Sequence, residues 1–352
     1  MATFKAIMKR VKIGTRESQL ATWQAKQVQL LLKKNNVESE LVFIKSEGDI
    51  DTITPLYELG VQGIFTRALD AALLNKKIDI AVHSMKDVPT RLAKGIRQAA
   101  VLKRATYQDI LVFKGERATI YHDLGFVNGE WSMVNGQSSM NLGGDIHDSR
   151  FTTHDSPFTP PAAPMTIATS SVRRKAQWLH RYPNHTLENL RGNLNTRLRK
   201  IDENHWHGAI FAAAGLERIH LRPENSITLD WMVPAPAQGA ITIACRAEDD
   251  EAFEACHLLN DEPTDVCTKI ERDFLRTLLG GCSTPIGALA VIASDKIIFK
   301  GNICSPDGQK VISIEKEFSL QDNSEWGVLA GTELLENEEA EQIIYGIQNA
   351  KK

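Results

Sequence analysis

The stretch Ile78–Pro89, which reads IDIAVHSMKDVP, decides how the first part of the chain folds. Its first, third and fifth residues are large and apolar, which predicts a β-strand. The polar residues that follow would lie at the carboxyl edge of a sheet, where open α/β sheets bind ligands. Lys86 stands beside Asp87 there, and a neighbouring cation keeps a carboxylate ionised at neutral pH. The residues alone leave two interpretations of Asp87: a group that stabilises a developing cation and exchanges protons with it, or half of an exposed ion pair.

Two strand–helix pairs are predicted before this stretch. Val11–Gly14 and Leu41–Ile44 are the strands, and the second is an apolar run typical of a buried strand. The first helix is predicted to bury one apolar face, made of Leu20, Trp23, Leu30 and Leu31. Residues 46–63 carry turn signals and predict a long loop, either a lid or disordered, before a helical stripe over 64–73. Strand, helix, strand, helix and strand in this order predict a parallel α/β domain.

A second α/β unit is predicted to begin with the strand Thr166–Ala168. Ser170 or Ser171 is a good N-cap for the helix that follows, and hydroxyls, backbone N–H groups and guanidiniums at a helix start make an anion site. Five arginines stand near strand ends of this unit: Arg173, Arg174, Arg191, Arg197 and Arg218. Each one alone reads as a surface charge, as does Arg16 after the first strand. Five in equivalent places predict a ligand that carries several carboxylates or phosphates.

The rest of the chain divides into an irregular segment, a crossing and a third unit. Residues 128–164 are rich in turn residues and show little periodicity, which predicts an insertion or a flexible interdomain segment. Pro234–Gly239 predicts a crossing back to the first unit, with Ile241–Cys245 as the returning strand. Three strands joined by turns follow, and a final helix is predicted over about Trp326–Ile347, so the third unit is a small α+β domain.

Cys282 stands in the stretch Leu278–Gly287, LLGGCSTPIG, between a helical pattern and a strand. The two glycines before it permit backbone conformations that a side chain forbids and let a bulky group approach closely. A loop cysteine at such a junction is a candidate covalent attachment point or nucleophile. The alternative is a small apolar residue that happens to contain sulfur.

Composition excludes several classes of protein. The chain has 352 residues, a formal net charge of −3 and five cysteines, an odd number with no C-x-x-C spacing. We therefore expect neither a disulfide framework nor a zinc site, and the scattered His122, His147 and His154 show no ligand spacing. The charge does not indicate a nucleic-acid or membrane-surface protein, and no apolar run reaches membrane-spanning length. Met1–Arg10 lacks the apolar core of a signal peptide, so we expect a cytoplasmic protein in a reducing compartment.

Four motifs together resemble the porphobilinogen deaminase family. They are, in chain order, His83–Pro89, Thr169–Arg174 (TSSVRR), Leu190–Asn193 (LRGN) and Gly280–Gly287 (GGCSTPIG). The resemblance covers nearly the whole chain, from Lys12 to the final helix, apart from the insertion. It implies an α/β fold with two lobes similar to type II periplasmic binding proteins, plus a small α+β C-terminal domain. The implied domains are 1–113 with 240–257, then 114–239 with the insertion at about 128–164, and 258–352.

The resemblance also implies the chemistry. The family joins four porphobilinogen molecules head to tail, with loss of ammonia, and releases hydroxymethylbilane by hydrolysis. The chain grows on a dipyrromethane cofactor, which would be bound to Cys282 through a thioether, and Asp87 would be the catalytic acid. By resemblance, the cofactor's carboxylates would be held by Ser84, Lys86, Ser170, Ser171, Arg173 and Arg174. The substrate and growing chain would be held by Arg16, Ser18, Arg191, Arg197 and Arg218. The implied protein is a monomer that binds no metal.

The sequence departs from the family's usual residues at several positions. Gln19 stands where proline is usual, Glu47 where arginine or threonine is common, and Gln62 at a lid position where lysine is usual. The family's Asp-Pro-Arg-Asp segment reads Thr106–Asp109, so Gln108 replaces an arginine. These departures concern lid contacts and one supporting arginine.

Two other classes of function fit parts of the sequence. The lobes alone would suit a non-catalytic protein that closes on an anion, although the Gly-Gly-Cys loop argues against it. A different cysteine-nucleophile transferase or hydrolase would need a histidine partner, and no histidine lies near Cys282 in the sequence. The mass of the intact chain separates these classes, because only the cofactor would add two pyrrole units to Cys282.

Overall fold

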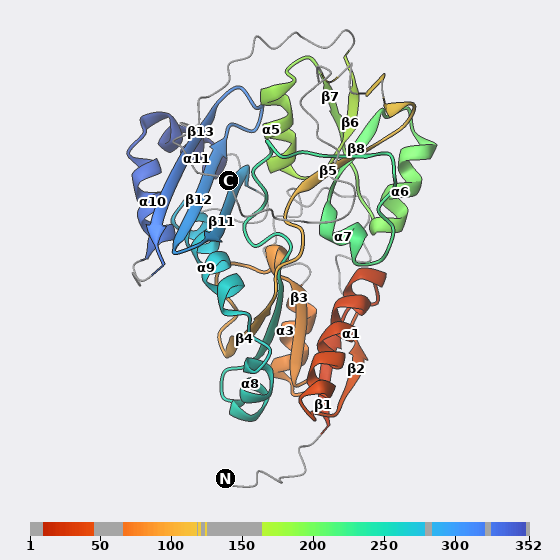
Figure 1. The fold of residues 1–352 in the computed structure, drawn as a ribbon, viewed down its shortest axis with the longest axis vertical. Helices are drawn as coiled ribbons and strands as arrows, with labels where there is room; N and C mark the ends of the chain where they lie inside the picture. The colour runs from red at the N-terminus through yellow and green to blue at the C-terminus, as the bar shows by residue number, and fades with distance from the viewer. Residues whose placement is uncertain are drawn as a thin grey trace.

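The computed structural model describes residues 10–45, 66–117, 119–120, 124, 164–278, 284–320 and 325–349. The predicted lid at 46–63, most of the predicted insertion and Cys282 lie outside these residues. Figure 1 shows three units in the described part: a first lobe, a second lobe above it, and a third unit beside them. The predicted fold class, two α/β lobes with a small α+β domain, is confirmed.

The first sheet has the strand order β2-β1-β3-β10-β4. Its strands are β1 Val11–Thr15, β2 Ser39–Phe43, β3 Ile80–Ser84, β4 Ile96–Leu102 and β10 Ile241–Arg246. β1 pairs in parallel with β2 and β3, whereas β10 runs antiparallel between β3 and β4. The expected parallel sheet is therefore wrong: the sheet is mixed, because the returning strand enters it in the opposite direction. The sequence pattern also missed β4, and the expected buried strand β2 is a half-buried edge strand.

Helix α1, Gln19–Lys34, does not bury the face that the sequence predicted. Its buried residues are Ala21, Gln24, Ala25, Val28 and Leu32, whereas Leu30 is 54% exposed. The stripe has helical spacing and combines smaller side chains and one glutamine with the fully buried Leu32. Trp23 and Leu31 pack only partly against this core, and Trp23 also lies under a guanidinium of the second lobe. The other helices of this lobe are α3 Arg67–Leu74, the 3₁₀ turn η1 Met85–Asp87 and α8 Asp250–His257.

The second sheet has the order β7-β6-β8-β5-β9. Its strands are β5 Asp109–Phe113, β6 Thr166–Ala168, β7 Thr186–Glu188, β8 Gly208–Ala212 and β9 Ser226–Thr228. The helices are α5 Val172–Arg181, α6 Leu194–Glu203 and α7 Ala213–Glu217. β5 pairs antiparallel with β8 and β9. The predicted end of the first domain at residue 113 therefore falls on the wrong side of β5, which belongs to the second sheet.

The third unit packs three helices on one antiparallel sheet, β11-β12-β13. The strands are β11 Ile286–Ala293, β12 Lys296–Cys304 and β13 Val311–Ser319, and the helices are α9 Glu262–Thr277, α10 Trp326–Leu335 and α11 Glu338–Asn349. The single final helix that the sequence predicted is two helices. Asn337 separates them, because its side-chain oxygen accepts the backbone N–H groups of Glu339 and Ala340 at 2.9 and 3.2 Å and starts a new helix.

A buried ion pair joins the third unit to the segment that crosses between the lobes. Arg104, just after β4, donates to both carboxylate oxygens of Glu271 on α9, at 2.6 and 3.0 Å. The fully buried Glu271 also accepts the backbone N–H groups of Ala237 and Ala290, at 2.6 and 2.7 Å. Each carboxylate oxygen of Glu271 thus accepts two hydrogen bonds, and these bonds offset the cost of burying its charge. No helix in the described residues is long and apolar enough to cross a membrane.

Candidate active site

Asp87 ends the 3₁₀ turn that directly follows β3, and its side chain is exposed. The turn is anchored at its start, where the backbone N–H of Met85 donates to the carbonyl of Ala240 at 3.0 Å. It closes when the N–H of Val88 donates to the carbonyl of Met85 at 3.1 Å. A buried strand thus delivers a carboxylate to the surface at the carboxyl edge of the first sheet, as its sequence position predicted.

Lys86 points from the same turn toward the second lobe. Its ammonium donates to the side-chain oxygen of Gln238 at 3.3 Å. The pKa of Lys86 is lowered to about 8, mainly by burial and also by Arg174 and Arg173, whereas Asp87 and Asp109 act to raise it. This cation therefore lies among other cations in a poorly hydrated place, which favours an anionic ligand.

Arg173 and Arg174 are buried at the start of α5, and both bind Asp109 at the start of β5. Arg173 donates to one carboxylate oxygen of Asp109 at 2.8 Å, and Arg174 donates twice to the other at 2.7 and 3.0 Å. Each also donates to a backbone carbonyl, of Val233 and Ile210 respectively. Burial raises the pKa of Asp109, but the two arginines and Lys86 outweigh it, so the pKa is well below its usual range. One carboxylate thus serves three cations.

The helix start that carries these arginines is capped as the sequence predicted. Ser171 is the N-cap of α5 and accepts the backbone N–H of Arg174 at 3.4 Å. Ser170 has a different place: its hydroxyl bonds the backbone N–H of Leu190 at 2.9 Å and the side-chain oxygen of Asn189 at 2.5 Å. Ser170 therefore ties the end of β6 to the end of β7.

Arg191 and Arg197 extend the positive region along the second lobe. Arg191 is 5% exposed and follows β7, whereas Arg197 is on α6 and donates to the carbonyl of Gly192 at 2.7 Å. Burial lowers the pKa of Arg197 to about 10, with Arg174 and Arg191 lowering it and Asp87 raising it. The structure therefore brings Asp87 of the first lobe into the electrostatic range of arginines of the second.

The remaining predicted contacts surround the start of α1. Ser18 caps α1 through the N–H of Ala21 at 3.3 Å, and Arg16 lies near enough to the buried His83 to lower its pKa, after burial itself, to about 4. Ser84 accepts a hydrogen bond from the buried Gln24 of α1 at 2.8 Å.

Arg218 lies where the second lobe meets the first. It donates to the carbonyl of Gly239 at 2.6 Å, and its guanidinium carbon lies 5.8 Å from the centre of the Trp23 ring. Burial lowers the pKa of Arg218 to about 10. Gln19, a departure from the family pattern, accepts a hydrogen bond from the side chain of Asn195 on α6 at 2.9 Å. α1 thus contacts the second lobe through both its start and its aromatic face.

The sequence reasoning missed two residues that organise the site, Asp109 and Gln238. Gln238 is 1% exposed and donates to Asp109 at 2.9 Å and to the carbonyl of Tyr107 at 2.7 Å while it accepts from Lys86. The sequence did contain a signal for Asp109. It is a single carboxylate at the start of a wholly apolar strand, and a carboxylate buried there needs a cation beside it. Nothing local marks Gln238, since its partners are more than 100 residues away.

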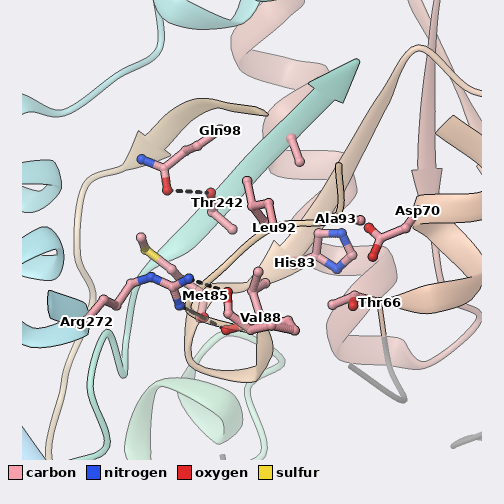
Figure 2. Close-up of a pocket in the computed structure, with 12 residues that line it drawn as sticks. Thr66, Asp70, His83, Met85, Val88, Leu92, Ala93, Gln98, Thr242 and Arg272 are labelled. Carbon is pink, nitrogen blue, oxygen red and sulfur yellow. Dashed lines mark hydrogen bonds between the residues drawn. The ribbon is translucent and has the colours of Figure 1, made fainter. Parts of the chain in front are cut away.

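A small pocket lies behind the Asp87 turn, inside the first lobe. Figure 2 shows His83 and Asp70 facing one another across it, with Thr66 beside them and Arg272 reaching in from α9. Burial raises the pKa of Asp70, with a hydrogen bond from Thr66 opposing this effect. Within the described residues no group of three or more His, Cys, Asp or Glu side chains could hold a metal ion.

Comparison with known proteins decides which family has this arrangement. The family model described as "Porphobilinogen deaminase, dipyromethane cofactor binding domain" matches residues 11–128 and 145–254. The model described as "Porphobilinogen deaminase, C-terminal domain" matches residues 266–336. The chain belongs to the porphobilinogen deaminase family.

Similar members of this family come from bacteria and plants. The chain is 35% identical over 334 residues to the porphobilinogen deaminase of Campylobacter hominis, covering 93% of this chain and 95% of that one. It is 36% identical over 337 residues to the chloroplastic porphobilinogen deaminase of Pisum sativum, covering 92% and 81%. Among solved structures, it is similar to an ancestral cationic amino acid solute binding protein, with a TM-score of 0.39 and 11% identity, covering 71% and 87%.

Proposed function

We propose that this chain is a hydroxymethylbilane synthase, which joins four porphobilinogen molecules head to tail, releases ammonia at each addition and frees the product by hydrolysis. The observation that carries the proposal is the family match over both the cofactor-binding and C-terminal models. It is supported by the position of Asp87 within electrostatic range of Lys86 and Arg197, whose side chains are half-buried. The dipyrromethane cofactor, bound through Cys282, supplies the primer to which substrate units are added.

The cations fit a ligand with many carboxylates. Lys86, Arg197 and Arg218 all have lowered pKa values because burial removes their hydration, and Asp109 is the only carboxylate that bonds Arg173 and Arg174 among the described residues. Each pyrrole unit carries an acetate and a propionate, so a bound cofactor or substrate would bring several carboxylates to these cations. Guanidiniums bind such groups with two parallel N–H donors.

We assign the ligand contacts in two groups. Lys86, Ser84 and Ser171 would bind the cofactor's carboxylates directly, whereas Arg173 and Arg174, held by Asp109, and Ser170, which fixes the end of β7, would complete that side of the site. The substrate and growing chain would be bound by Arg16, Ser18, Arg191, Arg197 and Arg218.

Asp87 would act on protons and charge. Its carboxylate is exposed, lies within electrostatic range of Lys86 and Arg197, and stands at the end of a turn fixed by backbone hydrogen bonds. A carboxylate in this place can stabilise a positive charge that develops on a pyrrole nitrogen, and can accept and return the proton there.

The mass of the intact chain and its turnover test the proposal. The wild-type chain should carry the added mass of two pyrrole units, and Cys282→Ser should lack it. Asp87→Asn should keep the fold, measured by circular dichroism, and lose ammonia release from porphobilinogen by at least a hundredfold. Normal product formation by Asp87→Asn would refute the role of Asp87. An unmodified wild-type chain that binds porphobilinogen without consuming it would favour the non-catalytic binding protein.

We further propose that the chain works as a monomer in the cytoplasm. The four cysteines in the described residues are free and buried, in keeping with a reducing compartment. Sedimentation of the purified chain near 39 kDa would support the monomer, and a concentration-independent dimer would refute it.

A further inference from the structure

The turn that carries Asp87 is held from behind by an arginine of the third unit. Arg272 on α9 donates to the carbonyls of Met85 at 3.3 Å, Val88 at 2.9 Å and Pro89 at 2.6 Å. Figure 2 shows its guanidinium at one side of the pocket, directly beside the turn at Met85 and Val88. These three carbonyls lie within the five residues 85–89, so one side chain spans the whole turn.

Backbone hydrogen bonds anchor the start of the turn and close it at Val88, and Arg272 adds the bonds to its later carbonyls. A three-residue 3₁₀ turn makes few internal hydrogen bonds, and η1 has no side-chain cap at its start. Its later carbonyls need donors once they are turned inward. A planar guanidinium offers five donors in a fixed geometry, and its charge strengthens each bond to a carbonyl dipole, so it restrains the turn in direction as well as position.

Helix α9 makes this restraint rigid. Glu271, the residue before Arg272, is fully buried and bonded to Arg104 and to two backbone N–H groups. The same helix ends at Thr277, five residues before Cys282 in the sequence. The element that leads into the cofactor-bearing loop therefore also holds the Asp87 turn.

We infer that Arg272 is a positioning residue for Asp87, which fixes the carboxylate by bonding three carbonyls of its turn and keeps the turn in register with the third unit. This inference rests on the proposed role of Asp87. We propose no direct contact of Arg272 with substrate or cofactor.

The test compares Arg272→Gln and Arg272→Lys with a matched control, Arg276→Gln. Arg276 lies one helical turn further along α9, is 41% exposed and pairs with Asp273 at 2.9 Å, away from the turn. For each variant we would measure cofactor loading by intact mass, kcat and KM for porphobilinogen per loaded chain, and amide hydrogen exchange of the peptide that covers residues 84–90.

We expect Arg272→Gln to lower kcat at least tenfold with KM changed less than threefold, and to speed exchange in this peptide at least tenfold. Arg272→Lys should fall between it and wild type, since an ammonium reaches fewer carbonyls, and Arg276→Gln should match wild type in both. A folded Arg272→Gln with kcat within twofold of wild type overturns the inference, whether or not exchange is faster. Equal losses in Arg276→Gln also overturn it.

Two further comparisons test the inference even if Arg272→Gln does not fold or Asp87→Asn remains active. If Arg272→Gln does not fold, Arg272→Lys decides alone, and wild-type kcat and exchange in that variant reject the inference. Asp87→Asn is measured in parallel: if it remains active, the proposed function of Asp87 fails. If Asp87→Asn is inactive while Arg272→Gln is normal, only the role of Arg272 fails.

Discussion

Asp109→Asn is the substitution whose effect follows most directly from the structure. The amide has nearly the shape of the carboxylate, so it leaves no cavity, but it removes the one negative charge that bonds Arg173 and Arg174. Their side chains are 4% and 8% exposed, and that of Asp109 is fully buried. The variant therefore leaves two guanidiniums in a place where water cannot replace the lost partner.

Asp109→Asn should lower the free energy of unfolding by a large amount. Removing one partner from a buried ion pair costs about 3–5 kcal/mol, because the other charge stays desolvated. For a cooperative unit of this size each kcal/mol lowers the melting temperature by about 2–4 °C, so the second lobe should melt about 6–20 °C earlier. Glu203→Gln is the matched control in the same lobe, since Glu203 is 52% exposed and pairs with Arg199 on one helix. It should change stability by less than about 0.5 kcal/mol.

The pH dependence of the melting temperature independently checks the direction of this stability change. The pKa of Asp109 is depressed in the folded chain, so its contribution to the free energy of unfolding is present above the unfolded pKa of about 3.9 and is lost as the pH falls through the folded value. The melting difference between wild type and Asp109→Asn should be constant from about pH 5 to 8 and should shrink below about pH 4. Calorimetry across this range measures it. A difference under 2 °C at pH 7 would refute the buried-charge argument.

Two further predictions concern Lys86 and the contact between the two lobes. Because burial lowers the pKa of Lys86 to about 8, an amine-acylating reagent should label it half-maximally near pH 8 in cofactor-free chain, whereas Lys296, whose pKa is raised by its hydrogen bond to Glu317, should need a higher pH than an ordinary lysine. Peptide mass spectrometry measures both, and parallel curves would contradict the prediction. Gln19→Ala should remove a hydrogen bond between the lobes worth about 0.5–1 kcal/mol, which corresponds to a rise of about two- to fivefold in KM with kcat nearly unchanged. Asn195→Ala should have the same effect, and additive losses in the double variant would show that the bond is not the cause.

Local patterns predicted most elements of the fold. The alternation at Ile78–Val82, the N-cap predicted at Ser170 or Ser171 and the turns of the third unit depend on neighbours in sequence, and each was found where expected. The prediction of a single final helix was wrong because Asn337 caps a new helix in the middle of the helical pattern. This cap is a local signal, but the apolar spacing continues through it. The predicted face of α1 was wrong because its large side chains were taken as core, whereas the buried stripe holds mostly smaller residues, with Leu32 as its large apolar side chain.

The sequence by itself determined the family and the places of the charged motif residues near strand ends, because motif order and periodicity are properties of the chain. Only the tertiary structure decided what those residues contact. Arg173 and Arg174 read as a free anion site, yet a carboxylate 64 and 65 residues away binds both. Arg272 carried no motif signal, yet it bonds a turn more than 180 residues earlier. Burial and charge pairing are set by which segments meet in space, and neither depends on spacing along the chain.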